Sequence, residues 1–369
     1  MSAVLAVNIG YSPRHAVLPP GSQPPRRRPR RILVIVTVLA LLGAGAAYAS
    51  LALLHPAQPR PARPAALVYS SNRLGLQGPG DLASDGRHIW ITNSAGSSVT
   101  EVGLRPHSRP VVRSGPGYGF LAPGAIAAGQ GHLWVADVVA NKITELAAAD
   151  GSVIGTISDA QGPHSMLLYR DQLWVANPGA NAVYQINTDT GKKARVFRRN
   201  GLQYPSALAV SHDLLWIANE AKGTLTLLNP VTGAWRATLK GAAFGLDRPV
   251  AEVAGHDMLW VASAGHSITQ INTATRKPVR IITGRRYRLG VPGPMALADG
   301  RLWVLNTIGN SVTEIDATTG QLVAVLDGPA YGFDRPVGIT ATHGAVWVVS
   351  ADSLTKLVLP ASARSAAVR

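Results

Sequence analysis

The sequence predicts an all-β fold, a seven-bladed β-propeller, preceded by one transmembrane helix. Two observations indicate the propeller: a tryptophan that recurs at a nearly constant interval, and short strands separated by turn residues. A sequence repeat of about 40 to 45 residues is typical of propellers and solenoids. Seven of the eight tryptophans fall in one register, with spacings of 44, 40, 42, 44, 43 and 44 residues: Trp90, Trp134, Trp174, Trp216, Trp260, Trp303 and Trp347.

Each repeat unit consists of short runs in which apolar and polar residues alternate, the pattern of half-buried strands. The breaks between the runs are rich in Asn, Pro, Gly, Asp and Thr, which are turn residues. Four antiparallel strands in each of seven units build a propeller, and the repeated tryptophan fills the contact between neighbouring blades. In the third unit the predicted strands cover residues 165–169, 172–176, 182–187 and 194–198.

The two ends of the repeat region indicate how the ring closes. The last unit has room for only three strands before Pro360. Residues 66–79 precede the first full unit and repeat the Gly-Leu-Gln-x-Pro pattern that follows the outer strand of the third unit. We therefore expect residues 66–70 to be the outer strand of the last blade, which leaves no open end to the ring.

A long apolar segment lies before the propeller, at residues 32–54. Its 23 residues carry no charge, and as a helix they reach roughly 34 Å, enough for a hydrocarbon core of ~30 Å. Five arginines directly precede it and, by the positive-inside rule, stay in the cytoplasm. The segment is predicted to be an uncleaved signal-anchor of a bacterial single-pass membrane protein, with the C-terminal domain extracytoplasmic.

Two alternatives to the anchor also export the propeller. Ala47-Tyr48-Ala49 resembles a signal-peptide cleavage site, which gives a secreted protein. Arg30-Arg31 permits a twin-arginine signal. Around the segment, residues 1–31 are predicted to be disordered and basic, residues 55–65 a Pro-rich linker, residues 66–360 the propeller and residues 361–369 a tail.

The net charge of +15 does not indicate a nucleic-acid partner. Residues 1–64 contain eight arginines and no acidic residue, so more than half of the excess lies beside the apolar segment. Residues 192–199 and 276–288 are further basic clusters, expected on outer strands and loops, and no recognition motif for nucleic acid accompanies them. They form either a rim that attracts anionic envelope polymers or lipid headgroups, or a solvated outer face. Without cysteine there is no disulfide and no thiolate chemistry.

Residues that break the repeat are the better functional candidates, because the fold already explains those that keep it. Asp81 and His164 are candidates for ligand binding, and the candidates for catalysis are Glu252, His164, Glu220 and His266. Glu252 is a carboxylate at an otherwise apolar position of the first strand, and His164 and Asp81 are exceptions near the start of that strand in other units. Glu220 and His266 are exceptions in the turns between the second and third strands. A carboxylate and a histidine near the channel could bind a divalent metal ion or transfer protons, and a hydrogen-bonded structural role is the alternative. No spaced ligand motif is present, so no cofactor is expected, with a divalent metal as the alternative.

Two further groups are candidates for ligand binding. One is a polar ring three residues after each repeat tryptophan, which lines the channel mouth or caps its own turns: Asn93, Asp137, Asn177, Asn219, Ser263, Asn306 and Ser350. The other consists of aromatic residues in Gly-rich loops, which stack on a ligand or pack over the adjacent blade: Tyr118, Phe120, Phe244, Tyr287, Tyr331 and Phe333.

The units of the form LWVAN…N-x-V…I-N-x-x-T-G resemble the YVTN-type and related NHL-like repeat propellers found outside bacterial cells. Virginiamycin B lyase-like propellers are a neighbouring relative. The resemblance covers about residues 66–360 and implies a binding, sensing or scaffolding module, with enzymes a minority. The lyase-like relatives imply a His/Glu/metal centre; here Glu220 and His266 fall in different blades, and Ser263 stands where a glutamate of the same blade is expected.

Two functions follow as hypotheses. The first is a membrane-anchored ligand- or protein-binding module with a protein or cell-envelope partner. The second is a metal-assisted lyase or hydrolase at the mouth of the channel. Catalysis requires carboxylate and imidazole groups that converge on one site, whereas docking requires only an exposed aromatic and basic rim.

Overall fold

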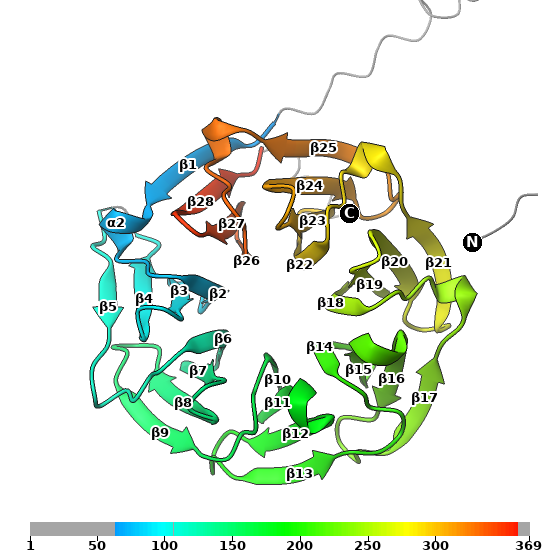
Figure 1. The fold of residues 1–369 in the computed structure, drawn as a ribbon, viewed down its shortest axis with the longest axis horizontal. Coiled ribbons are helices and arrows are strands. Elements are labelled where there is room, and N and C mark those ends of the chain that lie inside the picture. Colours follow the sequence, from blue (N-terminus) through cyan, green and yellow to red (C-terminus); the bar gives the residue numbers. More distant parts are fainter. Residues whose placement is uncertain (1–62, 106, 361–369) are drawn as a thin grey trace, which may run out of the picture. The chain divides into compact units, whose positions relative to one another are not determined.

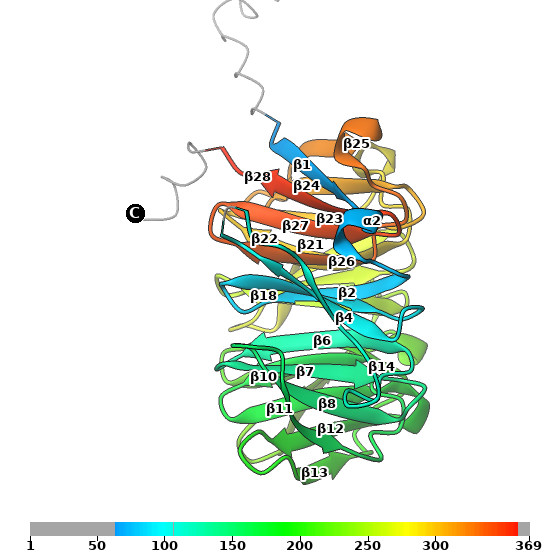
Figure 2. The ribbon, with the colours of Figure 1, turned by 90° about the vertical axis from the view of Figure 1, so that its left-hand side faces the viewer.

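The computed structural model describes residues 63–105 and 107–360, and its strands form seven four-stranded antiparallel sheets. The sheets surround a central opening, so the described part is a seven-bladed β-propeller, as predicted (Figure 1). Seen edge-on, the strands cross the thickness of the ring (Figure 2). Blades are numbered here in chain order from the first full unit.

Each of the first six blades consists of four strands that follow one another in the chain, from the innermost strand outward. Blades 1 to 3 contain β2 (Pro79–Ser84), β3 (His88–Asn93), β4 (Ser98–Gly103), β5 (Val111–Arg113), β6 (Pro123–Gly129), β7 (His132–Asp137), β8 (Lys142–Ala147), β9 (Val153–Ile157), β10 (Ser165–Tyr169), β11 (Gln172–Asn177), β12 (Ala182–Asn187) and β13 (Lys193–Phe197). Blades 4 to 6 contain β14 (Pro205–Ser211), β15 (Leu214–Asn219), β16 (Thr224–Leu228), β17 (Trp235–Leu239), β18 (Pro249–Gly255), β19 (Met258–Ser263), β20 (Ser267–Asn272), β21 (Lys277–Ile282), β22 (Pro292–Ala298), β23 (Arg301–Asn306), β24 (Ser311–Asp316) and β25 (Leu322–Asp327).

Blade 7 joins the two ends of the described chain. It consists of β26 (Gly338–Thr342), β27 (Ala345–Ser350), β28 (Ser353–Val358) and, outermost, β1 (Ala65–Ser70). β1 pairs antiparallel with β28, with Ala66 opposite Leu357. The predicted closure by an N-terminal outer strand is therefore confirmed.

Helices are short and lie in the connections. The described residues contain one α-helix, α2 (Ser71–Leu74), and the 3-10 helices η1 (Pro178–Ala180), η2 (Glu220–Lys222), η3 (Ala242–Phe244), η4 (Arg285–Tyr287) and η5 (Pro329–Tyr331). Among the described residues no helix is both long and apolar enough to cross a membrane. The predicted signal-anchor at residues 32–54 lies outside them, as do residues 1–31, most of the predicted linker and the tail.

The repeat tryptophans hold neighbouring blades together. All seven are almost completely buried, and each belongs to a hydrophobic cluster that includes residues of the next blade. Trp134 of blade 2 packs with Leu173 and Val175 of blade 3. Trp347 of blade 7 packs with Ile89 of blade 1 and so completes the ring. Large aromatic side chains bury much apolar area, which makes these contacts a main source of stability.

Candidate functional site

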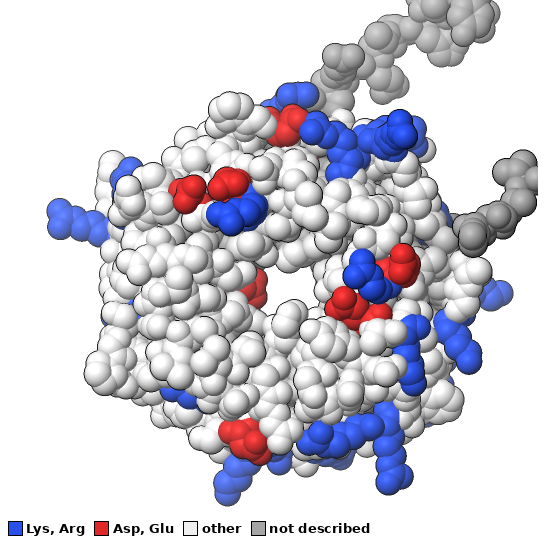
Figure 3. Space-filling view, viewed as in Figure 1, with Lys and Arg blue, Asp and Glu red and all other residues white. Residues whose placement is uncertain are grey.

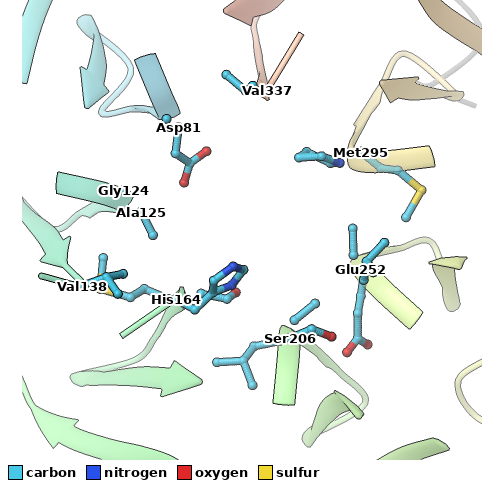
Figure 4. Close-up of a pocket in the computed structure, with 17 residues that line it drawn as sticks. Asp81, Gly124, Ala125, Val138, His164, Ser206, Glu252, Met295 and Val337 are labelled. Carbon is cyan, nitrogen blue, oxygen red and sulfur yellow. The ribbon is translucent and has the colours of Figure 1, made fainter. Parts of the chain in front are cut away.

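The innermost strands enclose a cavity of about 440 Å³, called here the channel cavity. It lies at the end of the channel where these strands begin, because its wall consists mostly of their first residues. Figure 3 shows the central opening, and Figure 4 shows the side chains around the cavity. Concave sites of this size are the usual place for small ligands.

Three residues that break the repeat meet at this cavity. Asp81 of β2, His164 just before β10 and Glu252 of β18 all line it. In Figure 4 the side chains of Asp81 and His164 point into the cavity, whereas the carboxyl group of Glu252 turns toward Ser206 of blade 4. The structure thus brings together side chains from blades 1, 3 and 5, which are far apart in the sequence.

Glu252 is buried without the usual compensation. Both carboxyl oxygens are shielded from solvent and neither has a hydrogen-bond partner. The hydroxyl of Ser206 instead donates to the carbonyl of Pro249 at 2.7 Å. Burial raises the pKa of Glu252 to about 8. The nearby backbone of Ala218 lowers this pKa only in part, and its geometry does not meet the criteria for a hydrogen bond. The carboxyl group is therefore largely protonated at neutral pH.

Asp81 is buried with hydrogen bonds. Its carboxylate accepts from the backbone N–H of Leu82 at 2.8 Å and from that of Ile126, in blade 2, at 3.2 Å. Burial raises the pKa of Asp81 to about 6, and these two N–H groups limit the rise because they stabilise the charged form. At neutral pH the cavity consequently carries one ionised carboxylate and one neutral carboxyl group.

His164 is the exposed member of the three. Its backbone N–H donates to the carbonyl of Ala176 at 3.0 Å, which fixes the start of the innermost strand against its neighbour. The imidazole lies on the cavity wall, where its ring nitrogens can form hydrogen bonds with a ligand.

The other two catalytic candidates do not line the channel cavity. Glu220 begins η2, in the turn between β15 and β16. His266 lies in the turn between β19 and β20, where its Nδ1 is 2.8 Å from the carbonyl oxygen of Leu289 and 3.3 Å from the backbone nitrogen of Val291. Within residues 63–105 and 107–360, no group of three His, Asp or Glu side chains is arranged to hold a metal ion.

The polar ring that follows the repeat tryptophans is buried inside the blades. All seven side chains are inaccessible to solvent, and none lines the channel cavity. Asn219 donates to the hydroxyls of Thr224 and Thr226 and accepts from the backbone of Gln203. Asp137 accepts from the backbone N–H groups of Leu121, Ala122 and Ala140. The bonds of Asp137 with Ala140 and of Asn219 with Thr224 lie within their own turns, as the turn-capping alternative expects. The bonds with Leu121, Ala122 and Gln203 join the turn to the loop before the innermost strand of the same blade. Asn93, Asn177 and Asn306 form their hydrogen bonds in the same region of their own blades.

The aromatic loop residues pack over the blades. Phe120, Tyr287, Tyr331 and Phe333 are buried, while Tyr118 and Phe244 are partly buried against the same clusters. Tyr331 and Phe333 are stacked with ring centroids 5.5 Å apart, and Tyr118 and Phe120 are stacked at 5.5 Å. None of the six lines the channel cavity.

The apolar wall of the cavity was not singled out from the sequence. Met166, Leu208 and Met295 occupy the same place in their strands as Glu252, and all line the cavity. The signal was the register, because these three residues share the strand position of Glu252. Leu82, Ile126 and Ile339 share it too, but they are buried in the core and do not line the cavity. Ser206 shares the register position of His164 and lies in the blade next to that of Glu252.

Comparison with known proteins identifies structural neighbours. No family model and no curated protein sequence matches the chain. Virginiamycin B lyase from Staphylococcus aureus superposes with a TM-score of 0.67 and 19% identity, over 80% of this chain and 100% of that one. A catalytically inactive histidine-to-alanine variant of that lyase, solved with quinupristin, matches equally well, with a TM-score of 0.67.

The fold is shared with propellers of other kinds. The WD40 repeats of RRP9 superpose with a TM-score of 0.66 and 12% identity, over 81% of this chain and 99% of that one. At these identities the likeness concerns the fold. It confirms the seven-bladed propeller, a fold that the chain shares with virginiamycin B lyase.

Proposed function

We propose that the chain is a binding module that takes a small ligand in the channel cavity. The observation that carries this proposal is the convergence of three departures from the repeat, Asp81, His164 and Glu252, on one concave site. Carboxyl groups with shifted pKa values in a cavity are typical of functional sites. Burying such a group lowers the stability of the protein, and the repeat would be satisfied by an apolar residue at the same position.

The charges of the cavity favour a ligand with a cationic or hydrogen-bond-donating group. Asp81 is ionised at neutral pH and points into the cavity, whereas Glu252 is largely neutral. Met166, Leu208 and Met295 supply apolar wall for the rest of the ligand. An amine or guanidinium facing Asp81, joined to an apolar body, fits both features.

A thermal-shift series tests this proposal. The full chain in detergent is heated with small amines and with carboxylic acids of the same carbon skeleton. A ligand at a hundred times its Kd stabilises the folded state by about 2.7 kcal/mol, so an amine that binds raises the melting temperature and its acid counterpart does not. Asp81→Asn is expected to abolish the rise. Equal shifts of the melting temperature with amines and with acids would contradict the proposal that Asp81 selects a cationic ligand.

The second candidate is a lyase or hydrolase at the same cavity. Glu252 is protonated up to about pH 8 and shares the cavity with His164, which are the groups that general acid–base catalysis uses. The fold neighbours support it, because one of them is a lyase solved with quinupristin. Incubation with quinupristin separates the candidates: elimination gives a product of unchanged mass, hydrolysis adds one water, and binding alone gives a thermal shift without product. Parallel incubations with a chelator or with added divalent ions test the metal.

The place of action is also part of the proposal. Residues 32–54 would hold the propeller outside the cytoplasm, at the membrane, where a protein or cell-envelope partner meets it. The apolar length and the arginines before it support this arrangement. Protease added to intact cells should digest the propeller while the N-terminal segment stays protected and in the membrane fraction. A propeller that stays intact until the cells are lysed would contradict the arrangement.

A further inference from the structure

One tryptophan of the eight is not used by the repeat. Trp235 is the first residue of β17, the outer strand of blade 4, and 50% of its surface is exposed. In four other blades the position equivalent to Trp235, as judged by the pairing of the two outer strands, holds Val153, Lys193, Pro278 or Leu322. None of these is aromatic, so the fold does not require an indole at this place.

Trp235 forms one wall of a second cavity, called here the rim pocket. Its volume is about 420 Å³, which is within the usual range for small-ligand sites. The polar residues that line it with Trp235 are Asn200, Lys222, Thr224, Thr238 and Lys240. They come from the loop before β14, from η2 and the start of β16, and from β17 and the residue after it. The pocket therefore lies at the outer edge of the blade and shares no residue with the channel cavity.

Hydrogen bonds hold the pocket in shape and leave donors for a ligand. The indole Nε1 of Trp235 donates to Thr238 Oγ1 at 3.2 Å, which fixes the orientation of the ring. Asn219 Nδ2 donates to Thr224 Oγ1 at 3.2 Å. Neither threonine hydroxyl donates a hydrogen bond to another described residue, so both protons are available to a ligand.

The two lysines have no acidic partner in the part of the chain that the structure describes. Neither Lys222 nor Lys240 takes part in a salt bridge among these residues. Lys222 is itself a departure from the repeat. The residue three places after the buried Asn or Asp is small in four other blades: Gly96, Ala140, Ala180 and Gly309.

The surrounding surface adds to this positive charge. Residues 192–288 hold 15 Lys and Arg against 5 Asp and Glu, whereas the other described residues hold 11 against 15. Figure 3 shows the basic side chains concentrated along the rim beside β13, β17 and β21. A one-signed field of this kind concentrates anions at the rim.

We propose that the rim pocket binds an acidic saccharide, a sugar that carries carboxylate, phosphate or sulfate groups. The apolar face of a pyranose ring stacks on the exposed indole, as rings do on tryptophan in binding sites. Lys222 and Lys240 bind the anionic groups as point charges, and the threonine hydroxyls donate to ring or hydroxyl oxygens. This site is separate from the channel cavity and from the function proposed for it.

Calorimetry on the full chain in detergent tests the site. The probes are trigalacturonate, galacturonate and neutral galactotriose. Binding of the acidic sugars is expected, weaker for the single sugar if the natural ligand is a polymer and equal if it is a free sugar acid. Trp235→Ala should weaken binding by about tenfold or more, and Trp235→Tyr should restore most of it. Lys222→Gln with Lys240→Gln should remove the preference for the acidic over the neutral trisaccharide and the dependence on salt.

Matched controls make the result specific. Lys277→Gln removes an exposed lysine from the outer strand of blade 5, in which Pro278 stands at the position equivalent to Trp235. This variant should leave the affinity for the saccharides unchanged. Asp81→Asn, in the channel cavity, should also leave it unchanged, which separates this proposal from the channel function.

Three results would overturn the proposal. The first is no binding of either acidic sugar at millimolar concentration. The second is an equal loss of affinity in Lys277→Gln, which indicates diffuse attraction to the rim. The third is a dimer that Trp235→Ala dissociates while the sugars do not bind, which assigns the exposed indole to a contact between two copies of the chain.

Discussion

Blade 4 contains two tryptophans, and they differ in burial, in packing and in how often their position recurs as tryptophan around the ring. Trp216, in β15, is 0% exposed and packs with Leu259 and Val261 of blade 5. Trp235, in β17, is 50% exposed and its indole bonds to a threonine on its own strand. The first occurs once in each blade, and the second occurs once in the ring.

The difference separates what the fold requires from what it permits. A residue that recurs at one place in every blade is explained by packing between blades. A residue that breaks the repeat is either compensated, as Asp81 is by two backbone N–H groups, or it is left with an unmet need. Glu252 and Trp235 are of the second kind, one a buried carboxyl group without a partner and the other an exposed indole. Such residues are where a ligand is to be sought.

The largest expected effect comes from truncating the two tryptophans of blade 4 in turn. Trp216→Ala opens a cavity between blades 4 and 5 and should lower the free energy of unfolding by about 3–5 kcal/mol. Trp235→Ala should change it by about 1 kcal/mol or less, because half of the side chain is already in solvent and it belongs to no core cluster. Urea unfolding of both variants measures the difference.

Trp216→Phe keeps the first test informative if the alanine variant does not fold, since it removes only part of the ring. The comparison between interior and edge would fail if Trp235→Ala destabilised the protein as much as Trp216→Phe.

The second prediction concerns the pH dependence caused by Glu252. Its pKa is about 8 in the folded protein and 4.5 when exposed. A raised carboxyl pKa favours folding at low pH, and this contribution is lost as the pH rises from about 4.5 to 8. At 1.36 kcal/mol per pKa unit, the loss amounts to roughly 5 kcal/mol. In Glu252→Gln this loss should be absent, so that the variant gains on the wild type across that interval.

Unfolding midpoints of wild type and Glu252→Gln, measured from pH 4 to pH 9, give the result. Parallel profiles would mean that Glu252 ionises normally and that the cavity holds no strained carboxyl group. Glu101→Gln serves as the matched control, because Glu101 is compensated by an ion pair with Arg113 at 2.6 Å.

Much of this arrangement could be predicted from the sequence, because a repeat carries its own alignment. The strands expected in the third blade coincide with β10 and β12 and differ from β11 by one residue at one end and from β13 by one residue at each end. The closing strand β1 begins one residue before its expected start. The same register assigned Asp81, His164 and Glu252 to the channel. It works because each of the seven units supplies an independent observation of one geometry.

The parts that could not be predicted depend on contacts that the register does not specify. For the aromatic loops and the polar ring the sequence left open whether the side chains face a ligand or pack into the fold. In the structure Phe120 and Phe333 pack into clusters, and Asn219 is buried and accepts from the backbone of Gln203. Alternation along a strand does not tell how far a loop folds over its neighbour. The rim pocket was missed for the same reason, since Trp235, Lys222 and Asn200 come from three separate segments.

A third prediction tests the compensated departure. Asp81 has a pKa of about 6, against 3.8 when exposed, so its contribution to folding is lost as the pH rises from about 3.8 to 6, by roughly 3 kcal/mol. Asp81→Asn should lack this dependence, but unlike Glu252→Gln it should also be less stable than wild type below pH 4, because an amide cannot accept both backbone hydrogen bonds. Denaturation at pH 3.5 and pH 7 distinguishes the two variants. If Asp81→Asn were as stable as wild type in acid, the backbone hydrogen bonds would not compensate for the burial of Asp81, and Asp81 would not differ from Glu252 in this respect.

The smallest predicted effect compares two indole hydrogen bonds of the same kind. Trp347, a repeat tryptophan, donates from Nε1 to Thr342 Oγ1 at 3.0 Å, and Trp235 donates to Thr238 Oγ1 at 3.2 Å. Thr342→Val leaves the donor of a buried ring without its partner and should cost about 1 kcal/mol. Thr238→Val should cost less than about 0.5 kcal/mol, since water replaces the lost acceptor at the exposed ring. The same Thr238→Val variant should nevertheless weaken saccharide binding, because the indole is no longer held in position. A substitution that weakens saccharide binding but leaves the free energy of unfolding nearly unchanged is expected where the outer strand contributes to a ligand site and little to the stability of the fold.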